Sequence, residues 1–187
     1  MRRPSNRVVM DAYACITGKR EIRTFADRPL ERGVLPKILE AGRRSGSSRN
    51  RQPWHFVVIE DRHRLRALAR CGRFAQHVAG AAAAVVILID TARDAFDAGR
   101  CAQNMMLAAW SLGIGSCPAT LHRTEPAHAL LGAPASKSIA IAVSFGYPHP
   151  RGRGQLERAV LRVLTGRGRR PLASMVSWEE YGRSTHA

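Results

Sequence analysis

The hydrophobic and polar positions along the chain predict a mixture of helices and strands. In residues 31–44, apolar positions from Val34 to Gly42 recur at the spacing of one helix face, and Pro36 falls in the first turn, where a proline is tolerated. Further helices are predicted at residues 10–16, 62–70, 125–131 and 155–164. Short apolar runs bounded by turn residues predict strands at residues 55–59, 81–90, 114–117 and 139–145.

The most apolar parts of the chain indicate how these elements pack. Residues 101–112 (CAQNMMLAAWSL) are apolar nearly all round and stop at Gly113, which predicts a central, fully buried helix. Residues 81–90 end in a continuous apolar run, which suits a strand buried on both faces. Because strands and helices do not alternate regularly, we expect an α+β fold with one sheet packed between helices.

The length of the chain favours one domain. Its 187 residues, 45% of them hydrophobic, suffice for one sizeable core and are few for two. We therefore expect a single domain over residues 1–187, with a Gly- and Arg-rich extension over about residues 150–187. An extension of this length cannot bury itself, so we expect it to wrap a second copy of the chain.

The net charge of +16 comes almost entirely from arginine and would attract polyanions and anionic ligands. Aromatic residues make up only 6% of the chain and are not interleaved with the arginines, as a platform for stacking bases requires. A nucleic-acid-binding protein is therefore an alternative without a motif behind it.

The spacing of the cysteines and histidines and the length of the apolar runs argue against several classes of protein. The four cysteines show no CxxC pair, the seven histidines show no HExxH or HxH, and we expect reduced cysteines and no metal site. No apolar run approaches the roughly 18 residues that span a membrane. The N-terminus lacks the apolar core of a signal peptide, so the sequence predicts a soluble, cytoplasmic protein.

Several short segments could bind an anion or a flat ring. Residues 18–25 (GKREIRTF) gather three cations within five residues, which suits a phosphate group. Residues 45–54 (SGSSRNRQPW) offer hydroxyl, amide and backbone donors, and Pro53 predicts an extended Gln52. Residues 112–122 contain a Gly-x-Gly turn that lacks the remainder of a dinucleotide fingerprint, and residues 166–171 are a basic run. Each segment alone also fits an ordinary solvated loop.

In combination, however, the blocks KREIRTF, GRRSGSSRNRQPWHFVVIED, DAGRCAQNMMLAAWSLGIGSCP, SFGYP and RGRRPL resemble the FMN-dependent nitroreductase family over about residues 11–178. This resemblance implies an intertwined homodimer of a nitroreductase-like α+β fold, a mixed sheet flanked by helices, with FMN at the subunit interface. It also implies that NAD(P)H reduces the FMN and that a small-molecule acceptor, such as a nitroaromatic compound or a quinone, is then reduced in the same site.

The resemblance also implies which residues hold the cofactor. The flavin carries the chemistry, so no side chain is expected to be catalytic. The expected FMN ligands are Lys19, Arg20, Glu21 and Arg23 from the basic block, Ser47, Ser48 and Asn50 from the opposite subunit, Pro118, Ala119 and Thr120 near flavin N5, and Arg167 and Arg169 at the phosphate. Gln103 and Asn104 are expected to pack at the dimer interface.

Two departures from the family pattern leave the activity open. Glu21 stands where many relatives carry serine, and its carboxylate could weaken FMN binding or change the flavin potential. The segment between Asp90 and Phe96 is short where relatives often insert a lid. The alternatives are other flavin chemistry, such as flavin fragmentation, dehalogenation or azoline oxidation, or a flavin-binding or nucleic-acid-binding protein on the same fold without reductase turnover.

Overall fold

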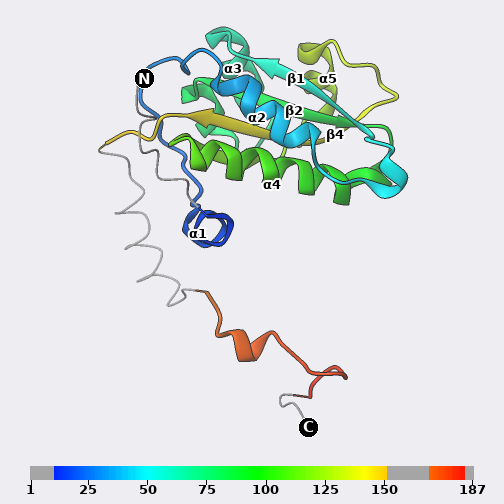
Figure 1. The fold of residues 1–187 in the computed structure, drawn as a ribbon. Coiled ribbons are helices and arrows are strands. Elements are labelled where there is room, and N and C mark those ends of the chain that lie inside the picture. The colour runs from blue at the N-terminus through cyan, green and yellow to red at the C-terminus, as the bar shows by residue number, and fades with distance from the viewer. Residues whose placement is uncertain (1–10, 151–168, 184–187) are drawn as a thin grey trace, which may run out of the picture. The chain divides into compact units, whose positions relative to one another are not determined.

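The computed structural model describes residues 11–150 and 169–183, and its centre is one four-stranded antiparallel sheet (Figure 1). The strands are β1 (Trp54–Ile59), β2 (Ala83–Ile89), β3 (Gly115–Ala119) and β4 (Ser138–Gly146), in the order β1-β2-β4-β3. Every residue of β2 is buried, as predicted for a strand covered on both faces. The first and last strands of this order, β1 and β3, form the two edges of the sheet.

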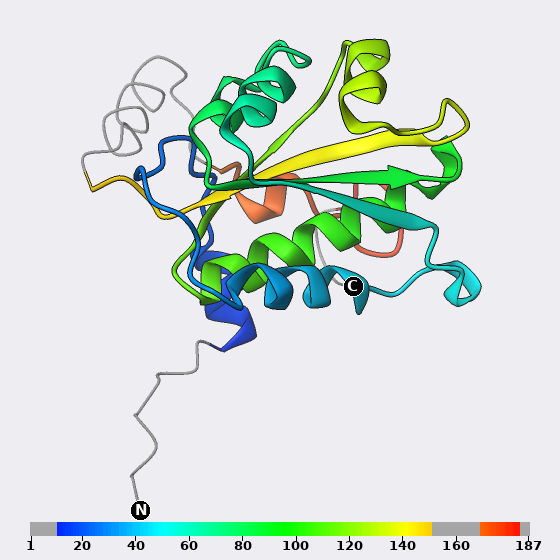
Figure 2. The same cartoon turned by 90° about the horizontal axis from the view of Figure 1, so that it is seen from above.

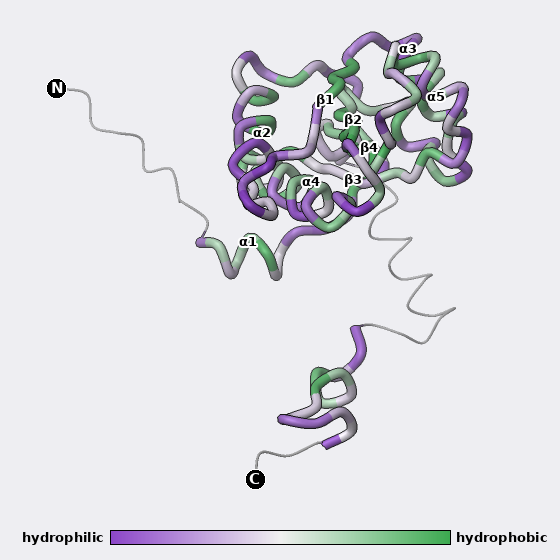
Figure 3. Tube along the Cα trace, turned by 90° about the vertical axis from the view of Figure 1, so that its right-hand side faces the viewer, coloured by the Kyte–Doolittle hydropathy of each residue, from purple (hydrophilic) through white to green (hydrophobic). Residues whose placement is uncertain are grey.

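The helices cover the two faces of the sheet in pairs (Figure 2). Val85, Ile87 and Ile89 of β2 pack into a core with helices α2 (Val34–Arg43) and α4 (Ala95–Ser111). The alternate residues Ala84, Val86 and Leu88 pack into a second core with α3 (Arg62–Ala69) and α5 (Thr124–Leu131). This alternation follows from the two-residue period of a strand, and it places hydrophobic β2 between the two layers (Figure 3).

The elements predicted within residues 11–150 are present, with shifted ends. Helix α1 (Ala12–Gly18) begins at Asp11, whose carboxylate accepts hydrogen bonds from two backbone N–H groups of the first turn. Helix α4 begins six residues before the predicted start, after a turn in which Thr91 and Asp94 cap each other. Both differences arise from capping residues, which a hydrophobic pattern does not contain.

The expectation of a fully buried α4 is wrong for the single chain. Cys101, Met105 and Ala109 are buried against the sheet and α2, but Gln103 and Asn104 on the opposite face are exposed. Phe96, in the first turn, is 76% exposed. The sheet and α2 cover one side of α4, and α1 contacts α4 near Leu107, so Gln103 and Asn104 still face outward in this chain.

The C-terminal part of the chain forms a second unit, and residues 169–183 are its described part. They contain one short 3₁₀ helix, η4 (Leu172–Ser174), and several exposed apolar side chains, among them Met175 and Tyr181. The predicted helix at residues 155–164 lies outside the described residues. That this extension wraps a partner stays a prediction.

In the described residues, no helix is long and apolar enough to cross a membrane, and no group of His, Cys, Asp and Glu side chains could hold a metal ion. All four cysteines are free and buried, as predicted.

Candidate functional site

The basic segment that follows α1 runs along the outer edge of β3. The backbone N–H of Ile22 donates to the carbonyl of Ser116 at 2.9 Å, and Glu21 forms a parallel bridge with the same residue. Gly115 permits this approach, since a Cβ atom there would lie 2.7 Å from Cβ of Ile22. The hydrogen bond and the missing side chain together place residues 19–23 beside Ser116–Ala119.

Lys19 is the most enclosed cation of this segment. Its residue is only 7% exposed, and its Nζ donates to Oε1 of Glu21 at 2.5 Å and lies 3.5 Å from Sδ of Met106 on α4. The carboxylate of Glu21 therefore lies in the site itself and engages the ammonium group.

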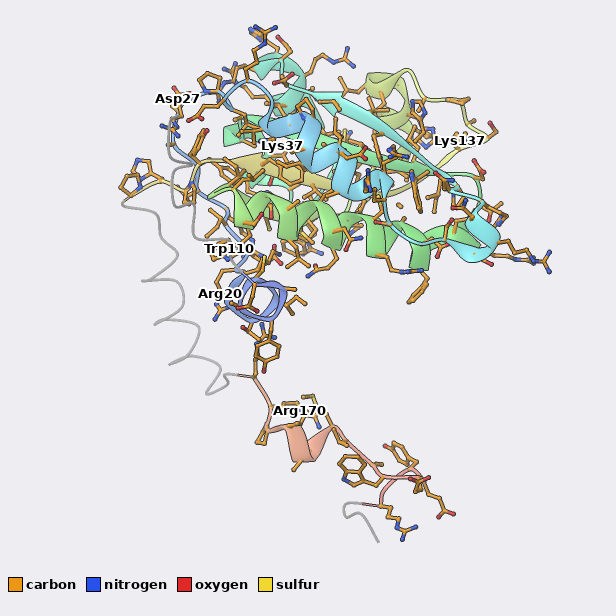
Figure 4. All side chains as sticks on the ribbon, in the orientation of Figure 1. Arg20, Asp27, Lys37, Trp110, Lys137 and Arg170 are labelled. Carbon is orange, nitrogen blue, oxygen red and sulfur yellow. The ribbon has the colours of Figure 1, made fainter. Side chains whose placement is uncertain are left out.

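Arg20 and Arg23 are both exposed, and they differ in what they contact. The guanidinium of Arg20 donates to the carbonyls of Thr17 and Lys19 at 2.7 and 2.8 Å, which closes the C-terminal end of α1 (Figure 4). Arg23 forms no ion pair with any described residue. Of the exposed cations in this segment, Arg23 is therefore the one available to an anionic ligand.

Pro118, Ala119 and Thr120, the residues predicted to face the flavin ring, lie at the C-terminal end of β3. Pro118 pairs with Val143 on its inner side, and a proline is accommodated because β3 is an edge strand. Ala119 is buried and Thr120 is exposed directly after the strand. The structure therefore brings Pro118, Ala119 and Thr120 to the same edge of the sheet as the basic segment.

A buried histidine, which the sequence reasoning did not single out, supports β3 from behind. Nδ1 of His77 lies 2.9 Å from Oγ of Ser144, and Ser144 Oγ donates to the carbonyl of Cys117 at 3.1 Å. Burial lowers the pKa of His77 to about 4, and the nearby charge of Arg23 acts in the same direction. A neutral imidazole thus holds the strand that carries Pro118. A lone histidine in a loop gave no signal of this position.

The thiol of Cys117 lies in the same environment. Burial raises its pKa to about 11, while the guanidinium of Arg23 has the opposite, smaller effect. A thiol with such a pKa stays protonated near neutral pH, so Cys117 is a packing residue and not a nucleophile.

The second predicted segment, the loop at Ser47–Asn50, has an unusual backbone. Arg49, Asn50 and Gln52 all have positive φ angles, of 52°, 53° and 50°. The extended conformation expected for Gln52 before Pro53 is therefore wrong. The N–H of Gln52 donates to Oγ of Ser47 at 2.8 Å, which folds the loop back on itself. Left-handed residues other than glycine store strain, and such strain gathers at ligand sites.

Two buried carboxylates at the start of α4 hold this loop. The backbone N–H of Ser48 donates to Oδ2 of Asp97 at 3.0 Å, and Arg51 donates to Oδ1 of Asp94 at 2.6 Å. Burial alone would raise the pKa of Asp94, but hydrogen bonds from Thr91 and Arg51 outweigh it and the pKa is lowered. The hydroxyl of Ser48 forms no hydrogen bond with any described residue, so it is available to a ligand.

The basic segment and this loop lie at opposite ends of α4. The loop is anchored at Asp97, whereas Lys19 contacts Met106. Nine residues of helix separate these anchors by about 14 Å. Within one chain the structure therefore does not bring Ser47, Ser48 and Asn50 together with the cations of the basic segment.

The remaining predicted residues contribute separately. Asn104 donates to Oγ of Ser45 at 2.8 Å, which ties α4 to the start of the loop, while Gln103 is exposed beside it. Arg169 is exposed in the second unit, and Arg167 lies outside the described residues. The contribution of Arg167 and Arg169 to a phosphate site stays a prediction.

Comparison with known proteins decides the family. The model of the nitroreductase family matches residues 16–86 and 72–147, which include both segments described above. The chain belongs to the nitroreductase family. The resemblance and the α+β fold class predicted from the sequence are thereby confirmed.

Curated relatives of this nitroreductase-family chain carry related names. A protein of Archaeoglobus fulgidus named as a NADH dehydrogenase/NAD(P)H nitroreductase is 35% identical over 105 residues, which cover 52% of this chain and 60% of the relative. A Methanothermobacter thermautotrophicus protein of the same name is 30% identical over 113 residues, covering 57% and 59%. The chain thus matches about three fifths of the length of these relatives.

The fold is also that of solved members of the family. A Desulfovibrio desulfuricans protein named as a nitroreductase and solved in complex with FMN is 28% identical, with a TM-score of 0.73. The likeness covers 97% of this nitroreductase-family chain and 99% of that structure.

Proposed function

We propose that this chain is an FMN-dependent NAD(P)H oxidoreductase of the nitroreductase type. The observation that carries the proposal is the basic segment fixed along the edge of β3, where the Ile22–Ser116 hydrogen bond holds Lys19 and Arg23 beside Pro118–Thr120. Relatives with NAD(P)H nitroreductase in their names, and a neighbour solved with FMN, support the same cofactor and donor.

The residues at this edge fit the charge of FMN. The cofactor carries a dianionic phosphate, which needs several charged donors. Lys19, Arg20 and Arg23 supply three cations against the one carboxylate of Glu21, and Arg23 is free of ion pairs among the described residues. Lys19 and Arg23 would hold the phosphate and the pyrimidine end of the ring, with Arg167 and Arg169 completing the phosphate site.

The protein's task in this proposal is to bind and orient. Bound FMN would take two electrons from NAD(P)H and pass them to a second substrate, such as a quinone or a nitro compound. Pro118 at the edge of β3 and Thr120 directly after the strand would offer backbone groups to the ring. The cation of Arg23 would stabilise negative charge at the pyrimidine end of the ring.

The separation of the two segments supports a homodimer as part of this proposal. Since Ser48 and Lys19 are anchored about 14 Å apart along α4, the loop of one copy would complete the basic segment of the other. The exposed face of α4, with Phe96, Gln103 and Asn104, is the surface that such a dimer would cover. The strained loop would then present the hydroxyl of Ser48 and the side chain of Asn50 to the ring.

The test begins with the visible absorbance spectrum of the purified protein and with chromatography of the cofactor that heat releases. We expect FMN at about one per chain, in line with two sites per symmetric dimer. NADH and NADPH are then added without oxygen, and we expect one or both to bleach the flavin. A flavin that stays oxidised with both donors would leave a flavin-binding protein, and a chain that takes up no FMN would refute the cofactor.

A further inference from the structure

A second group of cations lies at the far end of β3, beyond the proposed ring-facing residues. The loop after α3, residues 70–74, is tied to the segment after β3: the N–H of Arg123 donates to the carbonyl of Cys71 at 2.9 Å, and the N–H of Arg73 donates to Nδ1 of His122 at 3.4 Å. A Cβ atom at Gly72 would lie 2.5 Å from the carbonyl oxygen of Thr120, so only glycine allows this contact.

The backbone contacts bring the exposed cations of these two segments onto neighbouring loops. Burial raises the pKa of the Cys71 thiol, while the charges of Arg123 and Arg70 act to lower it, as expected if both guanidinium groups lie near that thiol. Arg70, Arg73, His122 and Arg123 are all exposed. Within residues 11–150 and 169–183, no carboxylate forms an ion pair with any of the three arginines.

An exposed aromatic ring, Phe74, stands beside one of these charges. Phe74 lies in the short loop after α3 and is 76% exposed. Its ring lies 5.4 Å from the guanidinium carbon of Arg73. An exposed phenylalanine gains nothing for the core, but it offers a face on which a flat ligand can stack.

We propose that Arg73, Phe74 and Arg123 form a subsite for an aromatic ligand that carries a negative charge. The ring would stack on Phe74, and the guanidinium groups would bind a carboxylate or a phosphate. Gly72, beside Arg73, packs against the carbonyl of Thr120, the last of the proposed ring-facing residues, so the role of the subsite in binding substrate rests on the proposed function. It would select anionic over neutral substrates at the mouth of the flavin site.

Two substrates could supply this chemistry: an aromatic acid as the electron acceptor, or the phosphates and adenine ring of the nicotinamide nucleotide. The kinetic test uses the full-length protein loaded with FMN and the acceptors 4-nitrobenzoate and its neutral analogue 4-nitrobenzamide. Values of kcat/KM are measured separately for donor and acceptor. The variants are Arg73→Ala with Arg123→Ala, and Phe74→Leu. The matched control is Arg32→Ala, which removes another exposed arginine, before α2.

For the double arginine variant we expect kcat/KM for 4-nitrobenzoate to fall about tenfold, the usual effect of losing hydrogen bonds to a charged group. The value for 4-nitrobenzamide should change by less than about twofold, as expected at a solvated surface. Phe74→Leu should weaken both acceptors equally. If kcat/KM falls for NADH and NADPH instead, the nucleotide is the anionic ligand. Equal values for wild type, double variant and control with every substrate would refute the subsite.

A binding measurement separates this inference from the proposed function. The protein, with or without FMN, is titrated calorimetrically with benzoate and with benzamide, neither of which can be reduced here. We expect benzoate to bind more tightly, and the preference to vanish in the double arginine variant and with added salt. A reductase that reduces 4-nitrobenzamide yet shows no preference for benzoate would refute the subsite alone. A protein without turnover that retains the preference would refute the reductase alone.

Discussion

Lys19 and Glu21 form an ion pair at the edge of β3, with Nζ of the lysine 2.5 Å from Oε1 of the glutamate. The side chain of Lys19 is 6% exposed and that of Glu21 is 40% exposed, so the carboxylate reaches solvent while it engages an enclosed ammonium group. In the proposed FMN site, this carboxylate competes with the phosphate for the same cation.

We therefore expect Glu21→Gln to tighten FMN binding. The substitution keeps the size of the side chain, removes its negative charge and frees the ammonium of Lys19. Since a partly exposed pair is worth at most about 1 kcal/mol, the Kd for FMN should fall about fivefold. The measurement is the quenching of FMN fluorescence on titration with apoprotein.

Lys19→Ala is the matched control, because it removes the other half of the pair. It should raise the Kd for FMN about tenfold or more, as the loss of a charged hydrogen bond does. Unchanged affinity in both variants would show that the phosphate lies elsewhere.

The close approach of Ile22 to Gly115 predicts a second effect. In Gly115→Ala, the new Cβ would meet Cβ of Ile22 at 2.7 Å, and the branched side chain of Ile22 has little freedom to give way. We expect a loss of unfolding free energy of about 1–3 kcal/mol, the usual cost of overpacking. FMN binding should weaken as well, because residues 19–23 are displaced from β3. Urea denaturation and FMN titration measure the two effects.

Gly80→Ala is the comparison for this variant, because nothing lies within 4 Å of a Cβ atom at Gly80. It should leave both quantities close to wild type. A stable Gly115→Ala protein with full FMN affinity would show that the basic segment does not depend on this contact.

The sequence predicted the elements well wherever a local pattern determined them. The helix expected at residues 62–70 is α3 (Arg62–Ala69), and the apolar run at residues 81–90 is the buried central strand β2. In both cases the hydrophobic pattern that predicts the element lies entirely within that element. The strand expected at residues 114–117 is β3 (Gly115–Ala119), which starts one residue later and extends through Pro118. A proline is tolerated there because β3 is an edge strand, which the sequence did not identify.

The site was less predictable, because its contacts join distant segments. His77 and Ser144 are 67 residues apart, and neither belongs to a motif. The loop with positive φ angles at Arg49, Asn50 and Gln52 is anchored to Asp97, 49 residues beyond Ser48. The rule for residues before proline predicted the opposite conformation for Gln52. The family resemblance named residues in both segments and assigned the loop to the opposite subunit, but the anchors of the two segments on α4 emerged only from the structure.

The buried imidazole of His77 makes stability depend on pH. Its pKa is lowered from 6.5 to about 4 in the folded chain, so the unfolded chain takes up the proton first as the pH falls. The stabilisation is complete above pH 6.5 and is lost progressively down to about pH 4. Linkage converts this difference to a loss of up to about 3 kcal/mol.

Chemical denaturation between pH 7 and pH 4 measures this loss. His77→Gln removes the titrating group and keeps a neutral polar side chain near Ser144, so its stability should change less over this range than that of wild type. Ser144→Ala is the control: it retains the imidazole and should keep the pH slope while lowering stability throughout. Parallel profiles for wild type and His77→Gln would exclude a role for His77 in the pH dependence.

The positions of Lys19 and Ser48 at opposite ends of α4 predict complementation between defective chains. One chain carries Lys19→Ala with Arg23→Ala, and the other carries Ser48→Ala with Asn50→Ala, so that each homodimer lacks half of every site. In a mixed dimer, one site combines both defects, while the other combines the intact basic segment of one chain with the intact loop of its partner. Random mixing of equal amounts should restore about a quarter of the FMN sites.

Two differently tagged chains, co-expressed and purified through both tags, give the mixed dimer alone. It should then bind about one FMN per two chains, as one intact site per two-fold dimer requires. A mixed dimer that binds no more FMN than either parent would mean that the loop and the basic segment serve the same chain. In that case the ligand would span the distance of about 14 Å between the two anchors on α4 within one subunit.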